Sequence, residues 1–481
     1  MYQQFGPLAP DRNPRLNDKY LRVADGVYSA SDGYKPVGQW AQVYPAMAAA
    51  PKGGASFVNP QGSVVIVAGT ATTLYRVQAG NWLQIASGFS IQGGQRWRFA
   101  QFGGMGIATN AADAMQKIDL EAGGVGPLGG SPPKFEALGV VKGFLIGTVM
   151  DGDVMTIAWS GAFNAEHWEF GFNQSDFYTL PTGGRVNGIL SGEFGIILQR
   201  NRIVRLDYVG GNLIFDPNEV SSNIGCVTVH SVAQWGNLGF FYSDEGWMMW
   251  DGTQPVPIGK EWIDAEFRTA YSVADWDRMS TAIDPVRGVL HVSVWNGSSG
   301  GKHYLYDWGL RRWSTVTYAS PVIFSGVTKG VSLDEQDPAV GAGDDNLDGA
   351  SLLSLDSATF RGGDPRLYVF ASDYKLGTFT GTPMAATLTG NDLEVFGGRR
   401  ANLRFVRPDI DSNSGITVTI GTKQRLADSL SSVAYTTIET SGDMPVRSSG
   451  RYCRVSVAVA AGTTWAHAKG VELIGAPGAG R

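Results

Sequence analysis

Histidine, the side chain most often used for metal binding and for acid–base catalysis near neutral pH, is scarce in this chain. The five histidines are His167, His230, His291, His303 and His467, and no two have the H-x₃-H type of spacing that favours a shared metal ion. The P-loop pattern G-x-x-x-x-G-K-[ST] is also absent, so ATP or GTP hydrolysis has no support. We therefore predict structural histidines, no catalytic residues and no cofactor.

Two acidic stretches come close to known motifs without completing them. "YSDEGWMMWDG" (242–252) resembles the Asp-box of sialidase propellers, but Asp244 directly follows Ser243 and Met249 stands where threonine is needed. "DDNLDG" (344–349) matches the first half of a calcium loop, whereas the twelfth position is Leu355 in place of the bidentate glutamate. We predict no metal site, and calcium binding by an otherwise ordinary acidic loop stays open.

The most basic stretch is "GGRRANLRFVRPD" (397–409), which holds Arg399, Arg400, Arg404 and Arg407. In a strand without a bulge, Arg400 and Arg404 would share one face, and Arg399 and Arg407 would also share a face. One interpretation is a solvated or subunit-facing strand. The other is a local contact with a passing polyanion.

Composition limits any wider contact with nucleic acid. Lys and Arg number 38 against 44 Asp and Glu, which gives a net charge of −6. Since tight binding to the DNA backbone needs a basic excess, we expect loose or local contact only. Cys226 and Cys453 are expected to be small buried side chains in a protein folded in a reducing cytosol. The pattern predicts neither a signal peptide nor a membrane-spanning helix.

The elements that must position these residues are short strands rather than helices. Runs of four to seven Val, Ile, Tyr, Phe and Trp residues are broken by Gly, Asn and Asp, and 65 glycines occur. The strand–turn–strand unit recurs at intervals of 39 to 56 residues, with the equivalent points Tyr75, Lys117, Thr156, Val204, Met249 and Leu305. Such a period is typical of propeller blades with four strands each.

Within these units, aspartate is expected to end a strand and begin a tight turn. Asp119, Asp207 and Asp307 stand at the end of a second apolar run, and Asp251 follows Trp250 in the equivalent place.

"YLYDWGLRRWSTV" (304–316) illustrates the choice that such a unit presents. Tyr304, Trp308 and Trp313 could form a stacking platform for bases or sugars. The repeat favours a blade hairpin instead, in which Tyr304 and Tyr306 share a face, Asp307 begins the turn and Trp313 packs between neighbouring blades.

These patterns predict an all-β chain: a β-propeller of six to seven blades with an N-terminal arm and a C-terminal β-sandwich. We expect an arm or docking segment over 1–50, a propeller body over 51–381 and a sandwich over 382–481. The polar stretch 329–365 is expected to be a loop-rich insertion, and 259–277 is the best helix candidate.

Several stretches, taken in order, resemble the tail hub or nozzle proteins of short-tailed bacteriophages, also called packaged-DNA stabilisation proteins. These are "VADGVYSASDGYKPVGQW" (23–40), "AWSGAFNAEHWEF" (158–170), "GWMMWDGTQPVPIGKEWIDAEF" (246–267), "LYDWGLRRWSTV" (305–316) and "GRYCRVSVAVAAGTTWAHAKGVELIGAPGAGR" (450–481).

The resemblance implies a structural virion protein without catalysis. Such proteins form a homohexameric ring below the portal and its adaptor, line the DNA exit channel, retain packaged DNA and carry fibres or a needle. It implies assembly in the bacterial cytoplasm, and double-stranded DNA that passes without sequence-specific binding. The alternatives are a glycan-binding propeller adhesin and a glycosidase.

Overall fold

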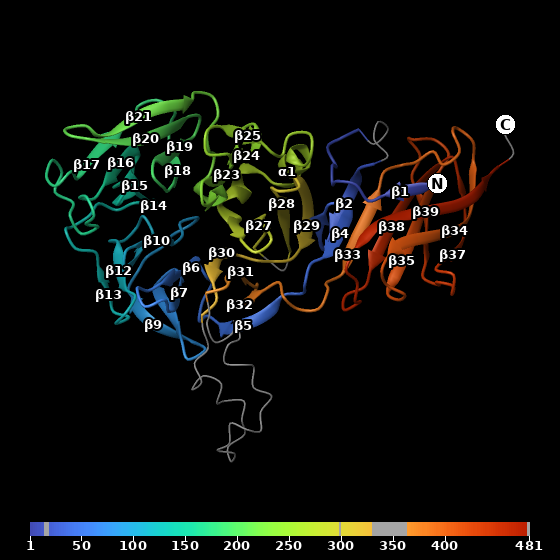
Figure 1. Ribbon diagram of the computed structural model, residues 1–481, viewed down its shortest axis with the longest axis horizontal. Coiled ribbons are helices and arrows are strands. Elements are labelled where there is room, and N and C mark those ends of the chain that lie inside the picture. Colours follow the sequence, from blue (N-terminus) through green and yellow to red (C-terminus); the bar gives the residue numbers. More distant parts are fainter. Residues whose placement is uncertain (14–18, 298–299, 330–362, 479–481) are drawn as a thin grey trace, which may run out of the picture.

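Four-stranded antiparallel sheets recur along the chain in the computed structural model, which describes residues 1–13, 19–297, 300–329 and 363–478. Within those residues there are seven such blades (Figure 1). From the inner to the outer strand, the first four blades are β6 (Gly53–Val58), β7 (Val64–Gly69), β8 (Thr73–Gln78), β9 (Asn81–Ser87); β10 (Arg98–Phe102), β11 (Met105–Thr109), β12 (Gln116–Asp119), β13 (Val125–Pro127); β14 (Ala137–Val141), β15 (Phe144–Met150), β16 (Asp153–Trp159), β17 (Asp176–Thr179); and β18 (Val186–Leu190), β19 (Gly195–Gln199), β20 (Ile203–Gly210), β21 (Ile214–Ser221). The other three are β22 (Ala233–Trp235), β23 (Leu238–Ser243), β24 (Gly246–Trp250), β25 (Pro255–Pro257); β26 (Met279–Asp284), β27 (Val289–Trp295), β28 (Gly301–Asp307), β29 (Arg312–Thr317); and β30 (Ile323–Val327), β31 (Pro365–Phe370), β32 (Lys375–Thr378), β5 (Ala41–Ala46).

The blades close into a ring, so the chain is the all-β propeller that the sequence predicted. The inner strand β30 of the seventh blade packs against β6 of the first. The six repeat points named above all fall on the third strand of their blades. The regular spacing therefore identified the same strand in each copy, because every blade repeats an apolar strand, a turn and a second strand.

Neighbouring inner strands are joined by side chains that imitate a β-ladder. Gln101 of the second blade accepts a hydrogen bond from the Val58 amide at 3.2 Å and donates one to the Val58 carbonyl at 2.6 Å. Gln234 of the fifth blade bonds Ser191 of the fourth in the same way, at 2.7 and 2.6 Å. These contacts satisfy inner-strand backbone groups that have no neighbouring strand on that side.

A β-sandwich lies beside the propeller (Figure 1). One sheet has the order β3-β4-β39-β34-β37, with β1 paired to β39, and the other has the order β2-β33-β38-β35-β36. The strands are β1 (Tyr2–Gln4), β2 (Leu21–Asp25), β3 (Val27–Ala30), β4 (Gly33–Pro36), β33 (Ala386–Gly390), β34 (Ala401–Ile410), β35 (Ile416–Lys423), β36 (Ser431–Tyr435), β37 (Met444–Gly450), β38 (Tyr452–Val459) and β39 (Ala468–Pro477).

Residues 1–50, which the sequence pattern assigned to an arm, are distributed over both bodies. Strands β1 to β4 belong to the sandwich, and β5 is the outer strand of the seventh blade. Strand β2 also meets β29 in parallel, at Asp25 and Thr315, so one nine-stranded sheet runs from the sixth blade into the sandwich. The N-terminal segment thus closes the propeller and joins it to its neighbour.

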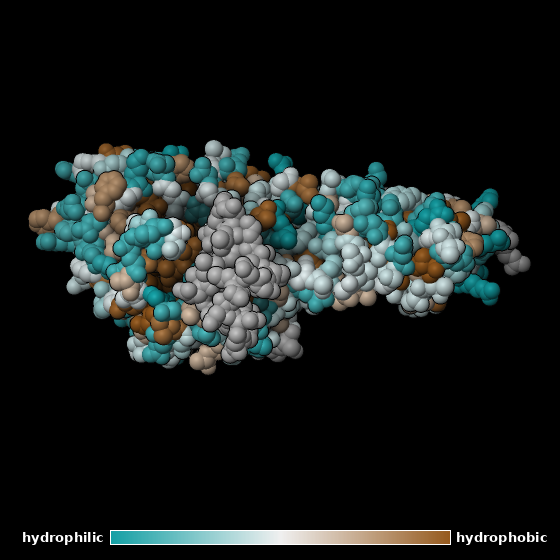
Figure 2. Space-filling view, turned by 60° about the horizontal axis from the view of Figure 1, so that its bottom comes forward, coloured by the Kyte–Doolittle hydropathy of each residue, from teal (hydrophilic) through white to brown (hydrophobic). Residues whose placement is uncertain are grey.

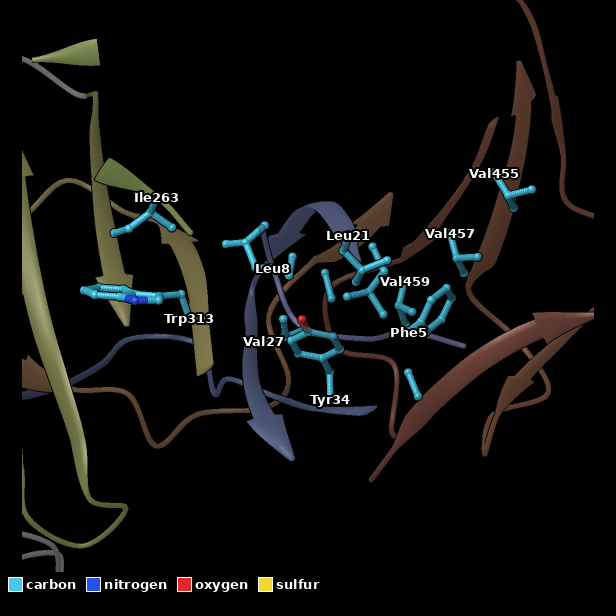
Figure 3. Packing of buried hydrophobic residues seen from close by; sticks show 14 of the residues in the cluster. Phe5, Leu8, Leu21, Val27, Tyr34, Ile263, Trp313, Val455, Val457 and Val459 are labelled. Atoms are coloured by element: carbon cyan, nitrogen blue, oxygen red, sulfur yellow. The ribbon is translucent and has the colours of Figure 1, made fainter. Parts of the chain in front are cut away.

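A shared apolar core fills the junction between the two bodies. Phe5, Leu8 and Tyr34 from the N-terminal segment lie between Trp313 of the sixth blade and Val457 of the sandwich (Figure 3). All five side chains are buried. Because this cluster is continuous, relative movement of the propeller and the sandwich would expose apolar surface.

The predicted helix over 259–277 is shorter and interrupted. It consists of α1 (Asp264–Ala270) and a 3₁₀ turn, η2 (Val273–Arg278); a further turn, η1, spans Val229–Ser231. The carboxylate of Asp11 caps α1 by accepting hydrogen bonds from the Ala265 and Glu266 amides at 2.7 and 2.9 Å. Most of the insertion predicted over 329–365 lies outside the described residues; its last residue, Pro365, begins β31.

Candidate functional site

Three of the predicted aspartates sit at strand ends and hold tight turns. Asp119 accepts hydrogen bonds from the Glu121 and Ala122 amides, both at 2.9 Å. Asp251 accepts from two amides in its own turn at 2.8 Å, and Asp307 accepts from the Leu310 amide at 2.8 Å. Backbone hydrogen bonds lower the pKa of Asp119 and Asp251. These carboxylates serve the turns rather than a ligand.

Asp207 differs from the prediction, because it lies inside a strand. Strand β20 continues past it to Gly210, and Asp207 pairs with Asp216 on β21. Its carboxylate accepts a hydrogen bond from Arg205 Nε at 2.9 Å. The turn follows at Gly210 and Gly211, both of which have positive φ. The sequence suggested an earlier end because Asp207 resembles the strand-ending aspartates of the other blades.

The aromatic residues of the blade hairpins are buried and hold neighbouring sheets together. Trp250, Tyr306 and Trp313 are each at most 3% exposed. Trp313 Nε1 donates a hydrogen bond to the Ile258 carbonyl at 2.8 Å, and its ring contacts Trp247 of the fifth blade. The stacking-platform interpretation of residues 304–316 needs exposed rings, and Tyr304 and Trp313 do not offer them.

The basic patch of four arginines lies on the sandwich, at and before strand β34. Arg399 and Arg400 precede the strand, and all four side chains are on exposed residues. The ladder shifts register between Leu403 and Phe405, which brings Arg404 and Arg407 to the same exposed face. The condition for Arg399 and Arg407 to share a face, a strand without a bulge, is therefore not met.

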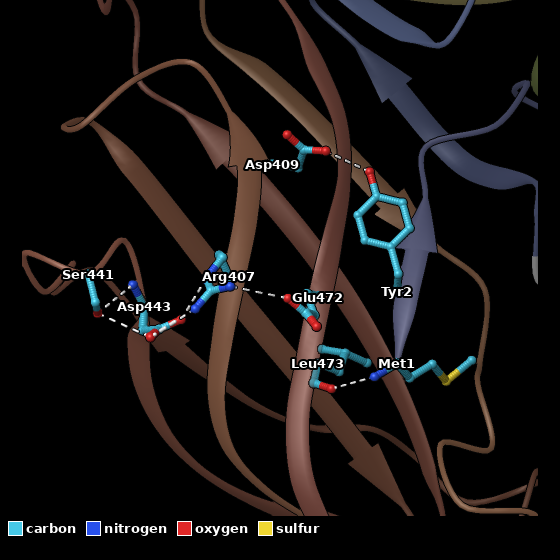
Figure 4. A network of polar contacts seen from close by, with 8 residues as sticks. All are labelled: Met1, Tyr2, Arg407, Asp409, Ser441, Asp443, Glu472 and Leu473. Carbon is cyan, nitrogen blue, oxygen red and sulfur yellow. Dashed lines mark hydrogen bonds and ion pairs between the residues drawn. The ribbon is translucent and has the colours of Figure 1, made fainter.

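Arg407 is neutralised within the patch. Its guanidinium meets the Asp443 carboxylate at 2.9 Å and Glu472 at 3.5 Å (Figure 4). Asp443 also accepts a hydrogen bond from Ser441, and Tyr2 of β1 donates one to Asp409 close by (Figure 4). This network fastens β1 and β39 to the sheet, so Arg407 serves the fold.

Arg404 lines an open groove of about 1050 Å³ with a second arginine that the sequence reasoning missed. Arg447, on β37, is exposed beside it, and Tyr435 Oη accepts a hydrogen bond from the Arg447 amide at 3.2 Å. Neither guanidinium forms an ion pair with a described residue. The alternation of "MPVRSSG" could have indicated Arg447, because it places the arginine opposite the buried Val446.

Replacing Arg404 and Arg447 together by alanine should weaken the retention of the protein on immobilised heparin at low salt. Two phosphate or sulfate contacts would be lost, so the elution salt concentration should fall. Arg407→Ala is the matched control, because Arg407 is already neutralised by carboxylates. Equal elution of the double variant and the unsubstituted protein would exclude this groove as a polyanion contact.

An exposed apolar edge, defined here as Phe163, Phe172, Phe177, Tyr178, Tyr208, Val209 and Leu213, lies on the third and fourth blades. The Tyr208 hydroxyl, on β20, donates a hydrogen bond to Gln174 at 2.9 Å and so joins the fourth blade to the segment before β17 of the third. In Figure 1 these blades lie at the end of the propeller away from the sandwich, and Figure 2 shows brown residues there within a hydrophilic surface. Clustered exposed apolar side chains commonly mark interaction surfaces.

Phe163 is the most prominent residue of this edge. It is 81% exposed and has a φ of 54°, a left-handed backbone that bulky residues rarely adopt. Its amide donates a hydrogen bond to the Gly143 carbonyl at 2.8 Å, which fixes the turn. A left-handed backbone at an exposed phenylalanine costs stability, and burial of the side chain within the chain does not offset that cost.

Neither a candidate metal-binding group nor a membrane-spanning helix is found among the residues that the structure describes. No group of three or more His, Cys, Asp or Glu residues gathers there in a way that could hold a metal ion. The acidic stretch 344–349 lies outside the described residues. Among the described helices, none is long and apolar enough to cross a membrane.

Comparisons with known proteins show shape similarity only. No protein-family profile and no curated protein matches the chain. The extracellular domain of a one-component system from B. thetaiotaomicron is similar over 84% of this chain, with 9% identity and a TM-score of 0.42; the chain spans about half, 48%, of that structure. The propeller domain of Cps50 (Swd1) from Myceliophteria thermophila aligns with 58% of this chain and 92% of its own, at 10% identity and a TM-score of 0.37. The WD40 repeats of RRP9 align with 62% and 89% of the two chains, at 11% identity and a TM-score of 0.36.

Proposed function

We propose that the protein is a structural subunit of the tail hub, or nozzle, of a short-tailed bacteriophage. Copies would form a homohexameric ring below the portal and adaptor, line the DNA exit channel and support fibre or needle attachment. The virion tail would be its location, after assembly in the host cytoplasm. The observation that carries this proposal is the exposed apolar edge, on which Phe163 is 81% exposed at a left-handed backbone position.

A closed ring needs two different surfaces on each subunit, one complementary to the other. The chain has chemically different ends. The apolar edge lies on the third and fourth blades, and the sandwich at the other end presents Arg404 and Arg447. The occupant we assign to the apolar edge is a second copy of this chain.

A subunit that transmits force also needs joined parts. The nine-stranded sheet through β2 and the shared core around Trp313 supply that joint. The net charge of −6 suits a channel wall along which DNA moves without being held.

Replacing Phe163 by aspartate should abolish ring formation while leaving the subunit folded. A charge in the centre of an apolar contact typically weakens association at least tenfold. Mass photometry of the full chain, alone and with the adaptor protein of the same virion, measures the fraction in six-fold complexes. Val286→Asp is the matched control, because Val286 is 65% exposed on the sixth blade, away from the edge.

Rings in the unsubstituted protein and in Val286→Asp, but not in Phe163→Asp, would support the proposal. A protein that stays monomeric with the adaptor and binds glycans on an array would overturn it in favour of an adhesin. Cleavage of fluorogenic glycosides would overturn it in favour of a glycosidase.

A further inference from the structure

The mouth of the propeller channel gathers basic side chains from several blades. Inner strands of a propeller run in the same direction, so the residues just before them meet at one end of the channel. Lys52 precedes β6, Arg96 and Arg98 stand at the start of β10, and His230 precedes β22. With the first residues of the sixth and seventh blades, Arg96, Arg98 and His230 line a cavity of about 220 Å³, and Lys52 directly precedes Gly53 of the same lining.

Alternation along "RWR" aims both arginines into this cavity. Trp97 turns to the core and donates a hydrogen bond to the Thr70 carbonyl at 2.9 Å. Arg96 and Arg98 therefore share the opposite face of the extended chain. Strands β10 and β11 form an ordinary antiparallel pair, and the alternating arginines before and at the start of β10 are the sequence signal for the cavity.

Arg98 is held in place by neutral partners. Its guanidinium donates to the Val229 carbonyl at 3.1 Å and lies 2.9 Å from Nδ1 of His230. Burial and the neighbouring Arg96 and Arg98 lower the pKa of His230 well below its usual value. His230 is thus a neutral acceptor for Arg98 and adds no competing charge.

Arg96 and Lys52 also use backbone carbonyls. Arg96 donates to the Asp277 carbonyl at 3.0 Å, and Lys52 donates to the Gly93 carbonyl at 2.9 Å. Burial and the positive charge of Arg98 lower the pKa of Arg96 to about 9. Burial and Arg96 lower the pKa of Lys52 as well. The cations therefore lie close enough to destabilise one another.

Carboxylates near the cavity do not neutralise it. Within the described chain, none of Lys52, Arg96 and Arg98 forms an ion pair. The Asp277 side chain is near Arg96 but exposed, and Glu136, near Arg98, is held by Arg185. Enclosed charges are costly unless a counter-charge joins them.

We propose that this channel mouth binds a small phosphate, either inorganic phosphate or the phosphate group of a small ester. The two guanidinium groups supply donors that a tetrahedral oxyanion prefers, and the ammonium group of Lys52 adds positive charge near Arg96. The cavity has room for about seven water molecules, which suits such an anion and is too small for a DNA duplex. This site goes beyond the proposed hub function and does not depend on ring formation.

Thermal unfolding of the full chain tests the site. Sodium phosphate or glycerol 3-phosphate at 10 mM, compared with sodium chloride of equal ionic strength, should raise the melting temperature by about 2 to 4 °C. Arg96→Gln should lose this rise. Arg278→Gln is the matched control, since Arg278 is exposed at the start of the sixth blade and should keep the rise.

Isothermal titration with the same two ligands measures binding directly. A higher melting temperature with both ligands assigns the site to the phosphate group itself. A higher melting temperature with only one ligand identifies the form of phosphate that the site accepts. The same rise in Arg96→Gln as in the unsubstituted protein, or no rise and no heat with either ligand, would overturn the proposal. If Arg96→Gln does not fold, Arg98→Gln replaces it, because Arg98 also lines the cavity. Ring formation by the proposed hub protein is measured separately, by mass photometry.

Discussion

Lowering the pH from 7 to 5 should destabilise the protein by about 4 kcal/mol through two histidines, His291 and His303. Both are fully buried between the sixth and seventh blades, and none of their ring nitrogens has a hydrogen-bond partner within the described chain. Burial lowers the pKa of His291 to about 3 and that of His303 well below its usual value. Arg287 adds to the shift of His291, and each histidine contacts Phe379.

The direction follows from proton linkage. An unfolded histidine takes up a proton near pH 6.5, whereas the native rings stay neutral, so stability is complete above about pH 6.5 and falls below it. Each histidine contributes about 1.4 kcal/mol per pH unit below that value, until its native pKa is reached. His230 acts in the same direction, because burial lowers its pKa well below its usual value. Asp264 acts in the opposite direction, because burial raises its pKa to about 6.

Denaturant unfolding at pH 7 and pH 5 measures this effect. The variants His291→Leu and His303→Leu should each remove about 2 kcal/mol of the stability loss between pH 7 and pH 5, whatever they do to the stability at pH 7. His467→Leu is the matched control, since His467 is exposed and lies 3.5 Å from Asp411. An unchanged pH dependence in both core variants would show that other groups cause the acid sensitivity.

Local patterns were enough to predict the propeller, because each blade repeats the same unit of an apolar strand, a turn and a second strand. Tyr75 and Leu305 are far apart in the sequence, yet both occupy a third strand. The place of the N-terminal residues could not be predicted, because a local pattern does not show which distant strand a segment will pair with. Strand β5 pairs with β32, more than 300 residues away, and the residues "AQVYPA" of β5 do not indicate which strand it pairs with.

The candidate sites, too, could be predicted only in part from the sequence. The arginine stretch before and along β34 was visible as composition, but the bulge at Leu403–Phe405 that sets its faces depends on two neighbouring strands. Arg447 and the Arg96–Arg98 pair were missed because their neighbours in space come from other strands and blades. Sequence spacing indicates which way a side chain points along one strand, whereas a site needs the relation between strands.

Replacing Trp313 by alanine should lower the free energy of unfolding by about 3 to 5 kcal/mol and reduce ring assembly with it. The side chain is fully buried, packs against Tyr306 at a ring distance of 4.8 Å and donates a hydrogen bond to the Ile258 carbonyl. It also belongs to the cluster that joins the propeller to the sandwich (Figure 3). Its loss would leave a cavity at the junction and the Ile258 carbonyl without its partner.

Denaturant unfolding and mass photometry of the same preparations measure the two effects together. Trp235→Ala is the matched control, because Trp235 lies on the fifth blade with 44% of its surface exposed and should change stability by less than about 0.5 kcal/mol. If Trp313→Ala kept full stability but lost binding of a sugar or nucleotide, residues 304–316 would be a ligand-binding surface after all. If stability fell while rings still formed normally, the junction would support the subunit without setting the geometry of the ring.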